Sequence, residues 1–180
     1  MKTLTLLRHA KSGWDDSIAR DFDRPLNAKG QRAAAAMGRH IRSLGLEFDH
    51  VIASPALRVT QTIDHLVTGY GETLAPHSDR RVYLASAATL LDIVRELPNA
   101  HARVLMVGHN PGLEDLVLLL VPDRAGDALR DAVEEKYPTA ALAELTLDAS
   151  HWADFAPDAA ILARFIRPRD VDASLGPDAE

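Results

Sequence analysis

The sequence predicts a single three-layer α/β/α sandwich around a mostly parallel sheet that contains one antiparallel strand. Three short apolar runs, at 4–7, 51–53 and 104–108, show no alternation of polar and apolar residues, which is typical of buried parallel strands. Helical patterns separate these runs, and this order of elements produces crossover connections with helices on both faces of one sheet. At 180 residues, the chain has the length of one domain with one core.

Capping residues and a further apolar pattern predict the first helices. Asn27 is a suitable N-cap for a helix that runs through Ile41, and Leu44-Gly45 supplies its stop. Ser54-Pro55 opens the next helix, with serine as the cap and proline at the first helical position. A further helix is expected over 88–97.

Two expected elements follow the third apolar run. Asn110-Pro111 repeats the arrangement of a polar cap and a proline before a helix over 113–120. Strands are then expected at 141–147 and 159–166. The first of these strands alternates enough to lie near an edge or to run antiparallel, so we expect a mixed sheet.

Two segments lie outside the pattern of strands and helices. The first is the polar loop 11–24. The second begins at Pro168, where the content of Asp, Gly, Pro and Ser indicates disorder. We therefore expect one folded domain over residues 1–167 and a flexible C-terminal tail over 168–180.

Composition excludes several classes of protein. Hydrophobic residues make up 47% and charged residues 26%, close to the average for a soluble globular protein. The chain has no cysteine, which excludes disulfides, thiolate zinc sites and thiol nucleophiles and fits a reducing compartment. A net charge of −6 argues against a coat on nucleic acid or anionic membrane. Because the first apolar run is too short for a signal peptide or a membrane span, we expect a cytoplasmic location. We also expect a monomer.

Chemically capable residues follow the predicted strands at their carboxyl ends. Arg8-His9 ends the first strand, Ser54 to Arg58 follows the second, and Gly108-His109 follows a later one. In open α/β sheets, ligands bind in the crevice beyond these ends. Two arginines and two histidines are therefore expected to face one pocket.

The residue types in this pocket predict an anion site with a nucleophile. Arg8 and Arg58 can grip a phosphoryl group through paired N–H donors, and helix starts at Pro55 and Pro111 add backbone N–H groups. A neutral imidazole can attack phosphorus in line when a hydrogen bond fixes its other ring nitrogen. His9 is the candidate nucleophile, because a rigid strand lies beneath it.

The remaining polar residues receive other interpretations. His109, at a helix start, is expected to donate a hydrogen bond or charge to the phosphoryl oxygens in the transition state. Lys11 and Ser12 occupy a polar loop, where a solvated role is at least as expected as contact with phosphate. We do not include them in the site. The other histidines show no paired spacing of the kind found in zinc sites, so no metal is expected.

These motifs resemble those of the histidine phosphatase superfamily, which also contains the cofactor-dependent phosphoglycerate mutases. Arg8-His9-Ala10 resembles its Arg-His-Gly signature, and RHAKSGWD, from Arg8 to Asp15, is similar to its RHGxSxWN run. Ser54 to Arg58 resembles the SPxxR element, and Gly108-His109-Asn110 resembles the later Gly-His element. The motifs occur in the family's order.

The resemblance implies a fold, an intermediate and a pocket. The fold is phosphoglycerate mutase-like, with residues 1–167 as the histidine phosphatase catalytic domain. The intermediate is a phosphohistidine on His9, and the phosphate pocket consists of Arg8, Arg58 and His109. No metal or organic cofactor is implied.

Within the superfamily, the likeness is greatest to small SixA-type phosphohistidine phosphatases. It rests on compact size, the RHAKSxW start, Asp23 to Asn27, and the sequence GHNPGLE. This likeness implies a phosphorylated histidine-phosphotransfer protein as the substrate and partner. A small phosphorylated metabolite, such as a sugar phosphate or nucleotide, is the alternative substrate. A phosphate-sensing binding module without turnover is the alternative from another class.

Two departures from the superfamily pattern bear on the substrate. Members that release alcohols carry a glutamate acid after the strand that corresponds to 81–84, whereas 85–88 offer no carboxylate here. An alkoxide leaving group needs a proton, but an imidazole, with a conjugate-acid pKa of about 6.5, leaves readily. The missing acid therefore favours a phosphoramidate substrate. Asp15 stands where the pattern has Asn, and either points away from phosphate or serves, like Asp16 or Asp21, as a replacement acid.

Overall fold

Six strands form one sheet in the order β3-β2-β4-β1-β5-β6 in the computed structural model, which describes residues 1–177. Strands β1 to β4 pair in parallel, whereas β5 runs antiparallel to both of its neighbours, β1 and β6. The prediction of a mostly parallel sheet with one antiparallel strand is therefore confirmed. The strands are β1 (Lys2–Arg8), β2 (His50–Ala53), β3 (His77–Ser78), β4 (Arg103–Gly108), β5 (Leu142–Leu147) and β6 (Ile161–Ile166).

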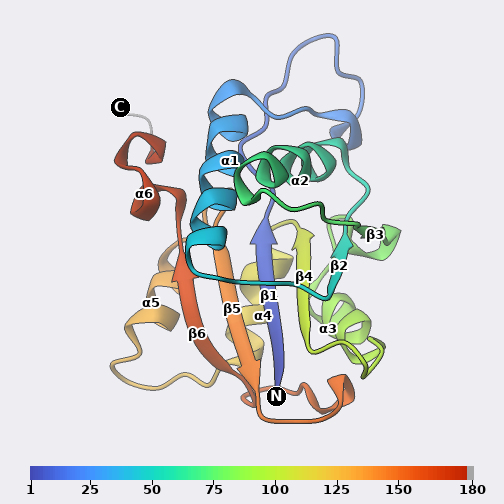
Figure 1. Cartoon of the computed structure of the whole chain (residues 1–180), viewed down its shortest axis with the longest axis vertical. Coiled ribbons are helices and arrows are strands. Elements are labelled where there is room, and N and C mark those ends of the chain that lie inside the picture. The colour runs from blue at the N-terminus through green and yellow to red at the C-terminus, as the bar shows by residue number, and fades with distance from the viewer. Residues whose placement is uncertain (178–180) are drawn as a thin grey trace.

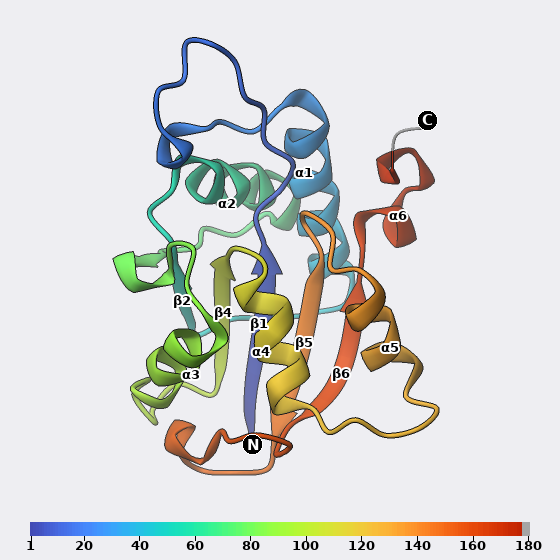
Figure 2. The ribbon, with the colours of Figure 1, turned by 180° about the vertical axis from the view of Figure 1, so that it is seen from behind.

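Helices cover both faces of this sheet, so the expected three layers are present. Figure 1 shows one face beneath α1 (Ala28–Ser43) and α2 (Leu57–Tyr70). The opposite face, seen in Figure 2, carries α3 (Ala87–Arg95), α4 (Gly112–Leu120) and α5 (Ala128–Glu135). The short helix α6 (Pro168–Val171) contacts α1. Four 3₁₀ turns complete the described elements, at Asp21–Asp23, Arg80–Val82, Trp152–Asp154 and Ala173–Leu175.

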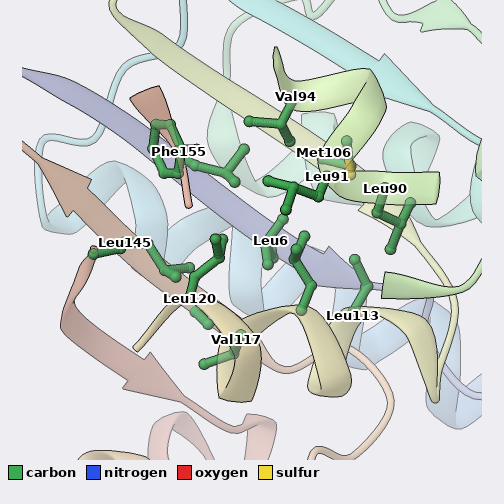
Figure 3. Packing of buried hydrophobic residues seen from close by; sticks show 14 of the residues in the cluster. Leu6, Leu90, Leu91, Val94, Met106, Leu113, Val117, Leu120, Leu145 and Phe155 are labelled. Atoms are coloured by element: carbon green, nitrogen blue, oxygen red, sulfur yellow. The ribbon is translucent and has the colours of Figure 1, made fainter. Parts of the chain in front are cut away.

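The central strands are apolar on both faces because both faces are covered. Leu6 and Met106 point into a cluster that includes Leu113, between the sheet and α4, as Figure 3 shows. Leu105 and Val107, the neighbours of Met106 in β4, point to the other face and join the cluster under α1 and α2. Period-2 alternation of side chains along a strand thus produces an unbroken apolar run when each face packs against helices.

The cap predicted for α1 is confirmed, and the one predicted for α2 is wrong. Asn27 Oδ1 accepts a hydrogen bond from Gly30 N at 2.8 Å, as an N-cap does. Helix α2, however, begins at Leu57 with Ala56 as its N-cap. Ser54 is buried at the end of β2, and its side chain contacts the functional site described below.

Three segments differ from the sequence prediction. The apolar pair in 81–84 suggests a strand, but Asp79 Oδ1 accepts from Arg81 N at 2.9 Å and closes a 3₁₀ turn. Strand β3 and helix α5 were not predicted. Strand β3 has only two residues, and Val133 is the one apolar residue of α5 that is buried, so neither element has a clear apolar pattern.

The segment 168–177 also differs from the expected flexible tail. It forms α6 and a 3₁₀ turn, and Leu175 is buried in the cluster under α1. Lys29 Nζ donates a hydrogen bond to Gly176 O at 2.5 Å. One leucine among polar residues is a weak signal in sequence, yet its burial anchors the segment. Residues 178–180 of the expected tail lie outside the described residues.

Helices α1 and α2 cross closely at two glycines. A Cβ atom on Gly38 would lie 2.1 Å from Leu66 O, and one on Gly69 would lie 2.0 Å from Ala35 O. Because such contacts cannot exist, Gly38→Ala must force the helices apart. We expect it to lower the free energy of unfolding by about 1–3 kcal/mol in urea denaturation. Gly13→Ala is the control, since the nearest atom there lies 3.9 Å away; equal losses in the two variants would contradict this packing.

Candidate active site

Three parallel neighbours, β2, β4 and β1, end at the same edge of the sheet (Figure 1). Arg8 is the last residue of β1 and pairs with Gly108, the last residue of β4. Ser54 N donates to Val107 O at 3.1 Å, and His9 N donates to Gly108 O at 3.0 Å. These backbone hydrogen bonds hold the three motif segments side by side, so the topology brings the predicted residues to one place.

His9 is held with one ring nitrogen occupied. The side chain is 8% exposed, and Nδ1 lies 2.7 Å from Ala10 O. Because a carbonyl oxygen only accepts hydrogen bonds, Nδ1 carries the proton and donates. The lone pair of the neutral ring is then on Nε2, which is the nitrogen available for attack on an electrophile.

Helix α2 fixes the backbone beside His9. Ala10 N donates to Thr62 Oγ1 at 2.9 Å, and the Thr62 hydroxyl donates to Arg58 O at 2.6 Å. Thr62 is fully buried. One helical turn of α2 therefore positions both Arg58 and the carbonyl that orients the His9 ring.

Arg58 points into the site and pairs with a loop carboxylate. Its side chain is almost completely buried, and Nη2 lies 3.0 Å from Asp21 Oδ2. Nη1 donates to Asp21 O at 2.8 Å. Tyr83 Oη also donates to Asp21 Oδ2, at 2.6 Å, and Arg24 Nη1 donates to Asp21 Oδ1 at 3.0 Å. The polar loop thus places a carboxylate against the guanidinium that is expected to bind phosphate.

His109 contacts Arg58 and Ser54 through its two ring nitrogens. Arg58 Nη2 donates to His109 Nδ1 at 3.2 Å, and a guanidinium has no acceptor, so Nδ1 is unprotonated. Nε2 then carries the proton and donates to Ser54 Oγ at 2.8 Å. The rings of His109 and His9 are 5.3 Å apart between centroids. In this state His109 is neutral, with its Nδ1 lone pair turned toward a cation.

Arg8 is anchored by the loop before β5. Nη1 donates to Tyr137 O at 2.9 Å, which leaves the other terminal nitrogen for a ligand. Its Nε is buried without a hydrogen-bond partner among the described residues, as is the Nε of Arg58. Burial lowers the pKa of Arg8 from its ordinary value. Buried guanidinium groups with open hydrogen-bonding capacity are suited to bind an oxyanion.

All four predicted side chains line one cavity of about 310 Å³. Lys11 and Ser12, which the sequence analysis left out, line it as well. Asp15 and Asp16 do not; Asp15 is exposed and accepts hydrogen bonds from the amide and hydroxyl of Ser17. The described lining residues are Arg8, His9, Lys11, Ser12, Asp21, Arg24, Arg58, Leu84, His109, Asn110 and Thr139.

Comparison with known proteins decides the family. The profile of the histidine phosphatase superfamily (branch 1) matches residues 4–135, a range that contains all three motif segments. The chain belongs to the histidine phosphatase superfamily. The uncharacterized protein Rv1276c of Mycobacterium tuberculosis is a relative in sequence, 36% identical over 164 residues that cover 91% of this chain and 100% of that protein.

Solved structures of this superfamily share the fold. A candidate phosphohistidine phosphatase, SixA, from Nakamurella multipartitia is similar with a TM-score of 0.79 and 28% identity, covering 93% of this chain and 96% of that one. A candidate SixA from Agrobacterium tumefaciens is similar with a TM-score of 0.76 and 26% identity, covering 93% and 98%. The phosphoglycerate mutase-like architecture expected from the motifs is therefore confirmed.

Burial controls the charge of both histidines at this superfamily site. It lowers the pKa of His9 to about 3, although the hydrogen bond to Ala10 O acts in the opposite direction. Burial also lowers the pKa of His109 to about 4, and the charge of Arg58 adds to that lowering. Both rings are consequently neutral at pH 7, and the positive field of the pocket comes from its arginines and Lys11.

Acid is expected to destabilise the fold through these two histidines. An unfolded histidine has a pKa of about 6.5, so between that pH and the folded values of about 3 and 4 the unfolded chain binds more protons. Stability contributed by His9 and His109 is thus complete above pH 6.5 and is lost as the pH falls. Urea denaturation at pH 7, 6 and 5 should show this decline.

A matched variant isolates the contribution of His9 to this pH dependence. His9→Gln removes one of the two groups and should flatten the fall in unfolding free energy between pH 7 and pH 5. His151→Gln is the control for the loss of a histidine, because His151 is exposed and lies outside the cavity lining. Identical slopes for His9→Gln and the parent would contradict the lowered pKa.

Two residues that contact the site, Thr62 and Tyr83, were not predicted from the sequence. Thr62 is a threonine inside a helix, one turn after Arg58, and only the helical register connects it to the site. Tyr83 forms an edge contact with the His109 ring, with centroids 5.3 Å apart, from a turn that was predicted as a strand.

The described residues were also compared with the requirements of a metal site and of a membrane-spanning helix. Within residues 1–177, no group of three or more His, Asp or Glu side chains is arranged to hold a metal ion. In the same part of the chain, no helix combines the length and apolar character needed to cross a bilayer.

Proposed function

We propose that the protein is a phosphohistidine phosphatase that uses His9 as the nucleophile, with Arg8, Arg58 and His109 around the phosphoryl group. The observation that carries this proposal is the His9 ring, neutral and locked through Nδ1, in one cavity with the half-buried Arg8 and the buried Arg58. His9 Nε2 attacks phosphorus, an N–P bond forms, and the bond from phosphorus to the leaving group breaks. Water then attacks the phosphohistidine and releases inorganic phosphate, which regenerates His9.

The arginines and His109 supply the stabilisation that the transferred group needs. Guanidinium N–H groups are donors in fixed directions, and in a partly buried site their interaction with equatorial phosphoryl oxygens is strong. A phosphoryl dianion that replaces Asp21 on Arg58 also faces His109 Nδ1. Protonation of that nitrogen then converts it from an acceptor to a donor toward the phosphoryl oxygen.

The loop carboxylate supports a phosphoramidate substrate. Burial acts to raise the pKa of Asp21, but hydrogen bonds from Tyr83, Arg24 and Arg58 outweigh it and lower the pKa to about 2. Asp21 is the one carboxylate among the described residues that line the cavity. Because it is ionised at pH 7, it holds no proton for an alkoxide. An imidazole leaving group does not need this proton, so phosphohistidine is the favoured substrate class.

The proposed substrate is a phosphorylated histidine-phosphotransfer protein, and a cytoplasmic location and a monomeric state belong to the same proposal. The SixA proteins that share the fold bear the name of phosphohistidine phosphatases. The decisive experiment compares kcat/KM for a phosphorylated histidine-phosphotransfer domain, an aryl phosphate and a panel of sugar phosphates and nucleotides. Preference for any metabolite by more than about a hundredfold, or roughly 2.7 kcal/mol, would overturn the substrate choice.

Asp21→Asn separates the phosphoramidate substrate from the ester alternative. If the acid is not required, turnover of phosphohistidine should stay within about tenfold of the parent, and inorganic phosphate should inhibit more strongly because Arg58 loses a competing anion. A metabolite phosphatase that uses Asp21 as its acid would instead lose about 10²–10⁴-fold on esters. Asp16→Asn is the matched control, since Asp16 is exposed and lies outside the cavity lining.

A further inference from the structure

A second cavity, of about 290 Å³, adjoins the active site. Its walls come from the end of β1, the start of α1, the loop between α5 and β5, and the segment from the end of β6 through α6. Six of the described lining residues are cationic, and none is acidic. We call this hollow the basic cavity. Its cationic residues are Arg8, Lys11, Lys29, Lys136, Arg167 and Arg169.

The basic cavity shares part of its wall with the catalytic pocket. Arg8, Lys11 and Thr139 line both. Arg8 lies between the two, anchored by its hydrogen bond to Tyr137 O. A molecule with its phosphoryl group beside His9 would therefore have the basic cavity as its neighbour on the far side of Arg8.

The charge of this cavity is opposite to that of the chain. The whole protein has a net charge of −6, yet six cations meet here. One of them, Arg167, donates hydrogen bonds from Nε and Nη2 to the carboxylate of Asp170, both at 3.0 Å, and another, Lys29, donates to Gly176 O. Lys136 and Arg169 make no side-chain hydrogen bond or ion pair within residues 1–177. Like charges gathered in a hollow repel each other, and an oxyanion offsets that cost.

The wall of the basic cavity is ordered by packing. Leu175 and Pro168 are buried, and Lys29 reaches Gly176 O across the rim. The C-terminal segment, held by these buried residues and by the Lys29 hydrogen bond, thus closes one side of the hollow.

We propose that the basic cavity is a subsite for a second anionic group, a phosphate or a carboxylate, carried by the same substrate molecule. This inference rests on the proposed function, because it takes His9 as the centre that receives the phosphoryl group. Two sources supply the same chemistry. One is an acidic side chain near the phosphohistidine of a protein substrate, and the other is a second phosphate on a small molecule.

The test uses two pairs of substrates that differ in the second anion. Phosphoimidazole is compared with a phosphorylated histidine-phosphotransfer domain, and a hexose monophosphate with the hexose bisphosphate. The variant is the double substitution Lys136→Ala and Arg169→Ala. It removes two exposed cations from the basic cavity. Arg42→Ala with Arg124→Ala is the matched control, because it removes two exposed cations that line neither cavity.

The measured quantity, in the parent and in each variant, is kcat/KM for the substrate with the second anion divided by kcat/KM for its partner without it. We expect the cavity variant to lower this ratio by about tenfold or more in at least one pair, and the control variant to leave both ratios unchanged. The pair that responds identifies the source of the second anion. Unchanged ratios in both pairs, or an equal fall in the control variant, overturn the subsite.

Failure of the proposed function gives a different pattern. If the parent hydrolyses none of the four substrates, or if His9→Ala retains parental turnover, the nucleophile assignment fails. If the parent is active and depends on His9 while both ratios stay constant in the cavity variant, the subsite alone fails.

Discussion

Replacing His9 by alanine is expected to lower kcat/KM by at least about 10⁴-fold for any phosphorylated substrate of this enzyme. In the proposed mechanism, Nε2 of His9 forms the bond to phosphorus, and among the described residues that line the cavity the one other histidine is His109. His109 cannot take over, because its Nε2 donates to Ser54 and its Nδ1 faces Arg58. Steady-state kinetics on the phosphotransfer domain and on an aryl phosphate measure the loss.

A trapping experiment connects this loss to the intermediate. Rapid quenching of the parent with labelled substrate should give a phosphoenzyme that is labile in acid and stable in base, as phosphohistidine is. His9→Ala should give none, whereas His151→Ala, at an exposed position, should give the parental amount. Turnover within about tenfold of the parent in a folded His9→Ala protein would show that another group is the nucleophile.

The sequence predicted those residues of the site whose positions follow from the order and direction of the strands. Arg8, Arg58 and His109 each follow an apolar run without alternation, and parallel strands must end at one edge of the sheet. Backbone pairing of β1 with β4 then aligns Arg8 with Gly108, next to His109. No detail of side-chain packing is needed for this conclusion.

The parts that sequence did not predict depend on contacts between distant segments. Asp21 was one of three acidic candidates in a polar loop, and only the folded chain shows that Arg58 and Tyr83 select it over Asp15 and Asp16. Hydrogen bonds from Tyr83, Arg24 and Arg58 lower the pKa of that carboxyl, and the sequence of the loop does not reveal these partners. Lys11 was interpreted as an ordinary solvated residue, because its place in the cavity lining also depends on the folded chain.

Helix α2 links Arg58 to His9 through one chain of hydrogen bonds. Arg58 O accepts from Thr62 Oγ1, which accepts from Ala10 N. The carbonyl of Ala10 then accepts from His9 Nδ1. One turn of helix thus positions both Arg58, the proposed phosphoryl-binding residue, and His9, the proposed nucleophile. Electrostatic catalysis requires such preorganisation.

Arg58→Ala is expected to lower kcat/KM by about 10²–10³-fold, the cost of removing a donor from a charge-stabilising site. Arg58→Lys is the matched control, since it keeps the charge and loses the paired donors, and should lie between alanine and the parent. A second readout follows from the position of Arg58 against His109. Because the Arg58 charge helps to lower the pKa of His109 to about 4, NMR titration of Arg58→Ala should show that pKa rising. A variant with parental kinetics and an unmoved His109 titration would place Arg58 outside the phosphoryl pocket.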